Sequence, residues 1–464
     1  MSKTKRHPGT RNARRQAKNV RSSQTPRSRD ASRRLRDIIS RNRKGESLGV
    51  YSVCSAHPAV IDAGLREAAS GGSLLLIEST SSQVNQYGGY MGQTPGQFAA
   101  NVRSAARATG VPQELLVLGG DHLGPYPWRD QPSETALQKA CELVRACVLA
   151  GYQKIHLDAS MACADDGHTL DDETIAQRTG LLCGAAENAR SDLSSPLSLL
   201  YVIGTEVPIP GGETEPGQPP AVTTARQLRH SVDVFRHVFE RQDLSDAWER
   251  VIAMVVQPGV EFGENLILPY DRRKARALSA ALPEHPCLVF EAHSTDYQTP
   301  SALTQMVEDH FAILKVGPAL TFAYREAVFA LSAIEREHLA GRCGTRLSRV
   351  REALDSAMQR NPSYWRSYYH GDEREQCLAR AFSYSDRCRY YWTDADVQKE
   401  VIQLLGNLSA GPLPSPLVSQ YLPVEYAAIR RGELPSTPQA LIQHHIRLVL
   451  HEYAAACGML NECQ

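Results

Sequence analysis

The sequence contains no run of about 18 consecutive apolar residues, so a membrane-spanning helix is not expected. It also lacks the apolar N-terminal stretch of a secretory signal, which argues against export. Its eleven cysteines, from Cys54 to Cys463, include no C-x-x-C pair, so neither a zinc ribbon nor a disulfide framework is expected. Several cysteines stand in apolar runs, where a buried free thiol is the simplest interpretation. Together these absences predict a cytosolic, cytoplasmic protein.

Nucleotide-binding motifs are also missing. Neither G-x-G-x-x-G nor G-x-x-x-x-G-K-[ST] occurs, which argues against a nucleotide cofactor and against a kinase. Lysine plus arginine and aspartate plus glutamate both number 51. The overall charge therefore gives no reason to expect a nucleic-acid or membrane partner.

This balance of charge hides one local excess. Residues 1–29 hold ten lysines and arginines and no acidic residue, and residues 1–34 lack periodic apolar positions, so a disordered basic arm is predicted. Three interpretations are open: electrostatic contact with a nucleic acid or another polyanion, a solvated arm without a role, or an extension from an upstream start codon. Ordered structure is expected to begin near Leu35, in a short helix that ends at Gly45.

Eight short runs rich in β-branched residues and leucine alternate with stretches of helical character. Most runs begin apolar and turn polar at the C-terminal end, and continuous apolar runs are typical of strands buried on both faces of a parallel sheet. A strand–helix unit repeated eight times predicts an α/β fold, the closed (β/α)8 TIM barrel, with an open doubly wound sheet as the alternative. The runs are residues 49–56, 73–80, 115–122, 154–160, 199–207, 250–259, 287–294 and 311–319.

The pattern changes after the eighth run, where long amphipathic helices begin. Residues 35–340 are therefore assigned to the barrel, and residues 341–464 to a C-terminal helical extension packed on it. Two long loops, 81–94 and 208–220, follow predicted strands. Loops of this kind at the C-terminal face of a barrel are where functional sites are built.

The polar ends of the predicted strands should bring ionisable side chains together at one mouth of the barrel. In K-I-H-L-D-A-S, His156 and Asp158 share one face of the strand and point into the lumen. The same alternation pairs Glu291 with His293. Four further strand ends complete the ring: Glu78, His122, Glu206 and Lys315.

Several ionisable groups that converge at low dielectric cost free energy unless a metal ion, an anion or mutual pairing offsets their charges. Lys315 is near the usual phosphate position of such barrels, and a Schiff-base lysine is the alternative. For any single residue of the ring, a self-satisfied buried network without a chemical role is also open. The side chains that suit an N/O-ligated divalent ion such as Zn²⁺ are His122, Asp158, Glu206 and His293.

Ten motifs together resemble one protein family. They are VCSAHP, SSQVNQYGGYMGQTPGQF, GGDHLGP, KIHLDASMACADD, VIGTEVPIPGGE, VVQPGVEF, EAHSTDYQTP, HFAILKVGPALTFAYREAVFAL, DRCRYYW and SQYLP. The chain resembles the Z subunits of class II tagatose-1,6-bisphosphate aldolases from about residue 35 to about residue 458. The stretch SYWRSYYHGDE looks most like the version from N-acetylgalactosamine and galactosamine catabolism, with the galactitol version as the near alternative. The basic N-terminal arm departs from the family.

The resemblance also implies a cofactor and a set of site roles. The cofactor is a divalent metal, Zn²⁺ or Mg²⁺, and no nucleotide is implied. The implied roles are proton transfer by Asp121 and Glu206 and metal ligation by His122, Asp158 and His293. From their places at the strand ends, the residues expected to bind substrate or phosphate are His156, Glu291 and Lys315.

Two functions follow from the resemblance. In the first, the chain is a chaperone-like subunit, not catalytic for the aldol step. It would support the activity and stability of a catalytic Y subunit that cleaves tagatose 1,6-bisphosphate, in a hetero-oligomer. In the second, the chain is itself a metal-dependent 4-epimerase that converts tagatose 6-phosphate to fructose 6-phosphate. The ring of ionisable groups favours the second, because a chaperone does not need it. The missing P-loop does not favour the older family label, tagatose-6-phosphate kinase.

Overall fold

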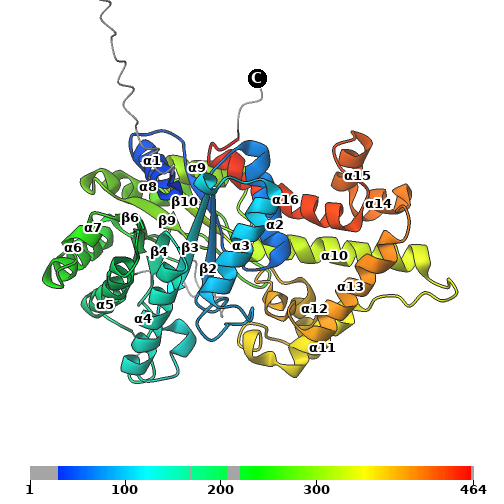
Figure 1. Ribbon diagram of the computed structural model, residues 1–464, viewed down its shortest axis with the longest axis horizontal. Helices are drawn as coiled ribbons and strands as arrows, with labels where there is room; N and C mark the ends of the chain where they lie inside the picture. Colours follow the sequence, from blue (N-terminus) through cyan, green and yellow to red (C-terminus); the bar gives the residue numbers. More distant parts are fainter. Residues whose placement is uncertain (1–29, 168, 196, 206–219, 461–464) are drawn as a thin grey trace, which may run out of the picture.

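The computed structural model describes residues 30–167, 169–195, 197–205 and 220–460, and in it eight parallel strands close into a barrel (Figure 1). Around the barrel the strand order is β1-β10-β9-β6-β5-β4-β3-β2. Each strand coincides with one of the eight apolar runs, so the predicted (β/α)8 barrel is confirmed. The strands are β1 (Val50–Val53), β2 (Leu75–Thr80), β3 (Leu116–Leu123), β4 (Lys154–Leu157), β5 (Leu200–Ile203), β6 (Val251–Val255), β9 (Val289–Ala292) and β10 (Ile313–Val316). A separate antiparallel pair consists of β7 (Glu261–Phe262) and β8 (Ile267–Leu268).

The outer helices begin where the sequence supplies a cap. Thr94 and Thr224 each form a capping box with a glutamine three residues later, and the Thr299 hydroxyl accepts a hydrogen bond from the Ala302 backbone. Within the described ranges no helix combines the length and the apolar character needed to cross a bilayer. The helices that follow the strands are α2 (Pro58–Gly71), α3 (Pro95–Thr109), α4 (Ser133–Leu149), α5 (Asp172–Ser191), α6 (Ala225–Arg241), the short α7 (Ser245–Trp248), α8 (Arg272–Ala281) and α9 (Pro300–Glu308).

Helix α1 (Ala31–Arg43) precedes the first strand and corrects the predicted start of ordered structure. Its N-cap is Asp30, whose side chain accepts a hydrogen bond from the Ser32 backbone N–H. Because this cap satisfies the first turn, the helix begins at Ala31 rather than near Leu35. The rest of the predicted arm, residues 1–29, lies outside the described residues.

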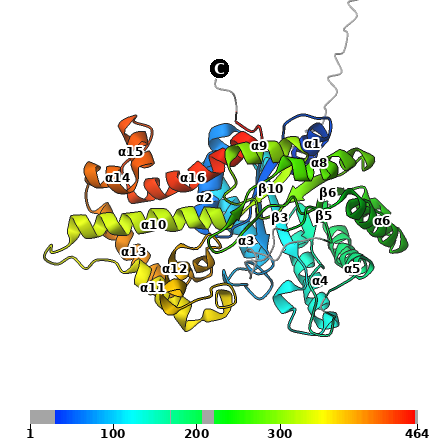
Figure 2. The same cartoon turned by 180° about the vertical axis from the view of Figure 1, so that it is seen from behind.

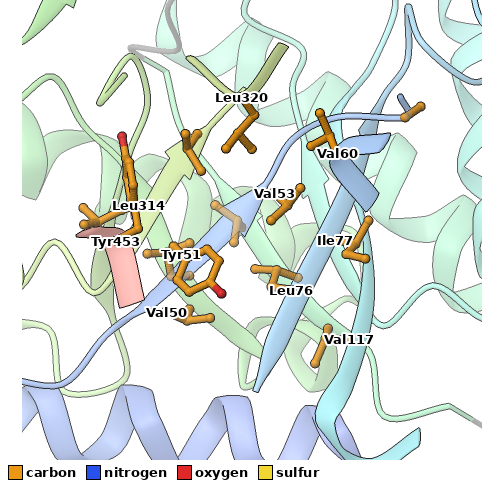
Figure 3. Packing of buried hydrophobic residues seen from close by; sticks show 14 of the residues in the cluster. Val50, Tyr51, Val53, Val60, Leu76, Ile77, Val117, Leu314, Leu320 and Tyr453 are labelled. Atoms are coloured by element: carbon orange, nitrogen blue, oxygen red, sulfur yellow. The ribbon is translucent and has the colours of Figure 1, made fainter. Parts of the chain in front are cut away.

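The eighth place in the outer ring of helices is taken by the last helix of the chain. Helix α10 (Pro318–Leu339) follows β10, but α16 (Pro438–Ala456) packs between α2 and α9. Figure 3 shows Tyr453 of α16 beside Tyr51 of β1, and their ring centroids are 6.4 Å apart. The Tyr453 hydroxyl donates to the Thr295 carbonyl at 2.7 Å. The barrel is therefore complete only when residues far beyond 340 are in place.

The other C-terminal helices gather around α10, on one side of the barrel (Figures 1 and 2). A buried ion pair, Arg325 Nε to Asp386 Oδ1 at 3.1 Å, ties α10 to the segment after α12. The predicted boundary between the barrel and a C-terminal extension at residue 340 stays a prediction. The chain beyond residue 340 is not all an addition to the barrel, because α16 belongs to the ring of the barrel. The helices in question are α11 (Val350–Arg360), α12 (Glu373–Phe382), α13 (Ala395–Ser409), α14 (Ser415–Tyr421) and α15 (Pro423–Arg430).

Helices α15, α16 and α10 meet at a charged contact that should make stability depend on pH. His445 lies 3.0 Å from Glu425 and 3.3 Å from Glu326. Burial opposes its charge, but the bonds to Glu326 and Glu425 raise the pKa of His445 to about 9. A raised pKa stabilises the fold below the unfolded value of about 6.5, and this gain disappears as the pH rises through about 9.

We therefore expect the free energy of unfolding to fall by about 1–2 kcal/mol between pH 6.5 and pH 9 from this residue, after allowance for solvent screening. Urea titrations of the wild-type chain and of His445→Gln at both pH values measure the effect. The variant should be the less stable at pH 6.5 and should lose less on going to pH 9. An equal loss in both chains would remove His445 as the source.

Candidate active site

A buried ion cluster fills the lumen toward the C-terminal ends of the strands. Glu78 of β2 accepts hydrogen bonds from Lys154 of β4 (Nζ to Oε1, 2.8 Å) and from Lys315 of β10 (Nζ to Oε2, 2.5 Å). Lys154 Nζ also lies 2.7 Å from Glu291 Oε2 on β9. Gly119 on β3 leaves room for this arrangement, because a Cβ there would lie 2.7 Å from Glu78 Oε1. All four charged side chains are buried, so their charges are offset by mutual pairing.

Strand β3 presents two consecutive residues to the cluster, which a regular strand does not do. Its register against β4 shifts between Gly120 and Leu123, and His122 adopts the left-handed region with φ 47°. This irregularity lets both Asp121 and His122 line the same mouth. Backbone strain of this kind at a non-glycine residue is concentrated at functional sites.

Asp121 links Lys315 to the imidazole of His156. Its Oδ1 lies 2.8 Å from Lys315 Nζ and 2.8 Å from His156 Nδ1. Burial favours the neutral acid, but Lys315 and His122 outweigh burial and hold the pKa of Asp121 well below its usual range. Burial likewise opposes the charge of Lys315, yet Asp121 and its other anionic neighbours raise the pKa of Lys315. The amine is therefore protonated, which does not support the Schiff-base alternative.

His122 and Asp158 form a separate pair beside the cluster. His122 Nδ1 lies 2.8 Å from Asp158 Oδ2, and Asp158 Oδ1 accepts from the backbone N–H and the hydroxyl of Ser160. Burial would raise the pKa of Asp158, but the bond to His122 holds it at about 2. Burial would lower the pKa of His122, but Asp121 and Asp158 raise it. The pair can therefore carry a proton near neutral pH.

Four residues bring ligand atoms close enough to share one metal ion. One ligand atom from each lies within 4.8 Å of the others in the set Asp121, His156, Glu291 and His293. Two observations support a fit to a divalent cation. The buried His156 Nε2 has no hydrogen-bond partner. Burial lowers the pKa of His293 to about 3, so its ring is neutral and keeps a lone pair for a metal.

This group differs from the metal ligands expected from the sequence. His293 belongs to both sets, but His122 and Asp158 bond to each other instead, because the bulge in β3 directs His122 Nδ1 at that carboxylate. Asp121, expected to transfer a proton, contributes a ligand atom. Glu206, expected to share that role, lies outside the described residues. Two members of the group were expected to contact substrate: His156 and Glu291.

The end of β10 does not offer a free cation for a phosphate group. Lys315, expected to bind phosphate there, is bonded to two carboxylates, at 2.5 and 2.8 Å. A helix N-terminus is the other natural anion site, but the start of α10 is already occupied. Asp296 Oδ1 accepts from the backbone N–H groups of Gly317 (3.0 Å) and Ala319 (2.8 Å). A phosphate at this mouth therefore needs a cation from elsewhere.

A pocket opens over the cluster, and the C-terminal region supplies part of its wall. The pocket is lined by Asp121, His122, His293 and Lys315 from the barrel, by Tyr90 from the loop 81–94, and by Arg389 and Tyr390 from the 3₁₀ turn Arg387–Tyr391.

The sequence analysis missed two charged residues of the site. Lys154 could have been found, because the alternation that places His156 in the lumen also places Lys154 there. Arg389 had only one signal in the sequence, its position in the motif DRCRYYW.

The fold and the site together define a (β/α)8 barrel protein with a buried, metal-suited cluster at its C-terminal mouth. A family model described as D-tagatose-1,6-bisphosphate aldolase subunit GatZ/KbaZ-like matches residues 35–458. The chain belongs to this family, whose members are subunits of tagatose-bisphosphate aldolase, and the sequence-based resemblance is confirmed at that level.

One solved structure is similar to this chain over most of its length. A chain from Sinorhizobium meliloti 1021, described as a probable tagatose 6 phosphate kinase, is 42% identical, with a TM-score of 0.80, and the match covers 88% of this chain and 100% of that one. A fructose-bisphosphate aldolase from Campylobacter jejuni matches at 13% identity and a TM-score of 0.41, over 82% of this chain and 92% of that one. The second likeness is too low to carry an argument.

Proposed function

We propose that the barrel mouth is an active site and that the chain is a metal-dependent 4-epimerase of tagatose 6-phosphate. One observation carries this proposal: a pocket opens onto a cluster that holds an unpartnered, buried His156 Nε2 within a four-residue group suited to a divalent cation. A subunit that only supports another protein has no need of such a group.

Inversion at C4 is equivalent to a reversible aldol cleavage. The C4 hydroxyl loses a proton, the C3–C4 bond breaks, and the bond forms again on the other face of the aldehyde, which takes the proton back. A divalent cation held by the four-residue group would supply positive charge that stabilises an oxyanion. The His122–Asp158 pair is the described group best placed to take and return the proton, because His122 lines the pocket and the Asp158 carboxylate beside it stabilises the imidazolium formed when the ring accepts a proton. Proton transfer by Glu206 stays a prediction.

The test uses the purified chain alone with Zn²⁺ or Mg²⁺ and tagatose 6-phosphate. Formation of fructose 6-phosphate is followed through coupled reduction of NADP. We expect turnover that a chelator abolishes and that the added metal restores. If the folded, metal-loaded chain shows no turnover, the epimerase proposal fails.

A second function is favoured by the family itself, whose description is an aldolase subunit. In that case the chain supports a catalytic Y subunit in a cytosolic hetero-oligomer and serves galactosamine, N-acetylgalactosamine or galactitol breakdown. Addition of the chain should then raise the aldolase activity and the melting temperature of the purified Y subunit. A Y subunit that is unaffected in both measurements would count against this function. The two functions are compatible.

A further inference from the structure

Arg389 is a half-buried cation in the wall of the pocket, and no carboxylate lies within ion-pair distance of it among the residues the structure describes. Its guanidinium donates to the backbone carbonyls of Ser385 (2.5 Å) and Asp386 (3.0 Å) and to the Tyr390 hydroxyl (3.0 Å). These partners orient the charge, while the carboxylates of Asp386 and Asp296 act on it from beyond ion-pair distance. A partly buried guanidinium that forms no direct ion pair with a carboxylate keeps N–H donors and charge available, which is the feature expected where an anion binds.

The chain holds Arg389 over the barrel with a strained turn. Asp386 adopts φ 45°, and its carboxylate accepts from Arg325 Nε (3.1 Å) and from the Thr321 hydroxyl (2.7 Å), both on α10. Because α10 begins at the barrel mouth, these bonds fix the position of the turn relative to the cluster. A left-handed conformation at a non-glycine residue costs free energy and persists only where its surroundings enforce it.

The pocket wall also shows the effect of this positive charge. Burial would raise the pKa of Tyr390, but the charges of Arg389 and Arg387 outweigh burial and lower it below its usual range. Elsewhere in the same mouth the available cation, Lys315, is neutralised by two carboxylates, and Asp296 caps the start of α10. Arg389 is therefore the cation of this pocket that is left to meet an anion.

We propose that Arg389 binds the phosphate group of the sugar phosphate, while the sugar extends toward the metal-suited group below. This inference rests on the proposed function for the identity of the sugar, but not for the binding of phosphate. It assigns substrate recognition to the C-terminal region, and it replaces Lys315 as the phosphate-binding residue.

The test compares wild type with Arg389→Gln and Arg389→Lys by titration with tagatose 6-phosphate, with unphosphorylated tagatose and with inorganic phosphate. Binding is read from calorimetry and from the melting temperature, which need no turnover. We expect about 10- to 100-fold weaker binding of tagatose 6-phosphate to Arg389→Gln, and a smaller loss for Arg389→Lys, which keeps the charge but not the planar fork. Inorganic phosphate should raise the melting temperature of wild type but not of Arg389→Gln.

Arg129→Gln is the matched control. Arg129 is exposed and lies over the Tyr126 ring at 4.8 Å, but it does not line this pocket. The same change of charge there should leave the affinities unchanged. Equal affinity for tagatose 6-phosphate in wild type, Arg389→Lys and Arg389→Gln overturns the inference, even if wild type has epimerase activity. If tagatose 6-phosphate binds in a manner that depends on Arg389 but is not turned over, the phosphate-binding inference stands and only the epimerase proposal fails. If Arg389→Gln does not fold, the comparison of Arg389→Lys with wild type decides.

Discussion

Replacement of His293 by alanine should abolish metal binding and lower turnover of tagatose 6-phosphate by about 1,000-fold, which corresponds to about 4 kcal/mol of transition-state stabilisation. His293 is the residue that the sequence-based metal set and the four-residue group in the structure have in common. The pKa of His293, lowered by burial to about 3, means that the ring is neutral, so a cation does not have to displace a proton from it. Metal content after gel filtration and the coupled assay measure the two effects.

His285→Ala is the control for this prediction. His285 is also a buried imidazole, and burial lowers its pKa too, but it stands just before β9, at the opposite end of the barrel from the cluster. The control should keep metal and turnover. Because His293 carries no charge, its removal leaves no unpaired ion, so both variants should unfold at similar temperatures. Stoichiometric metal in His293→Ala would show that this residue is not a ligand.

A chain that stops at residue 437, and so lacks α16, should fail to form a stable barrel. The helix buries five large apolar side chains: Leu441, Ile442, Ile446, Leu450 and Tyr453. At about 1.5–3 kcal/mol each, their burial contributes about 8–15 kcal/mol, which is comparable to the whole stability of a typical domain. Without α16, the groove between α2 and α9 would also expose the apolar face that the helix covers. Near-UV circular dichroism and thermal unfolding measure the loss.

Two comparisons keep this prediction testable if the short chain is insoluble. A chain that stops at residue 460 retains α16 and should unfold like the full chain. Leu450→Ala, in the centre of α16, should cost about 2–5 kcal/mol, whereas Leu181→Ala, on an exposed side chain of α5, should change stability by less than about 0.5 kcal/mol. A stable barrel in the chain that ends at 437 would mean that α10 can replace α16 in the ring.

The barrel could be predicted because its strands carry a local signal. Each strand is buried on both faces, so most of its residues are apolar even where single ionisable side chains enter the lumen, and the eight runs are visible one at a time. The lumen-facing positions could be predicted for the same reason, since Lys154, His156 and Asp158 follow from alternation along one strand. Only the assignment of a role to each lumen-facing residue required the distances between strands.

The division of roles at the site could not be predicted from the sequence. Whether His122 meets a metal or Asp158 depends on the bulge in β3, which shifts one side chain relative to another strand. Arg389 reaches the pocket through a turn held by Arg325, and no periodic pattern links these two residues to the strands. The same applies to α16, because nothing in its amphipathic pattern states which helices it will contact.

The position of α16 also has a consequence for synthesis of the chain. Arg447 and His451 of α16 bond to Glu67 of α2, across 380 and 384 positions of the sequence. The ribosome completes β10 at Val316 and reaches Pro438 only about 120 residues later, which takes about 6–24 s at about 5–20 residues per second. During that interval all eight barrel strands have been synthesised, but the groove between α2 and α9 is not yet covered by α16. A nascent chain of this protein therefore presents an apolar groove to chaperones until α16 has been translated.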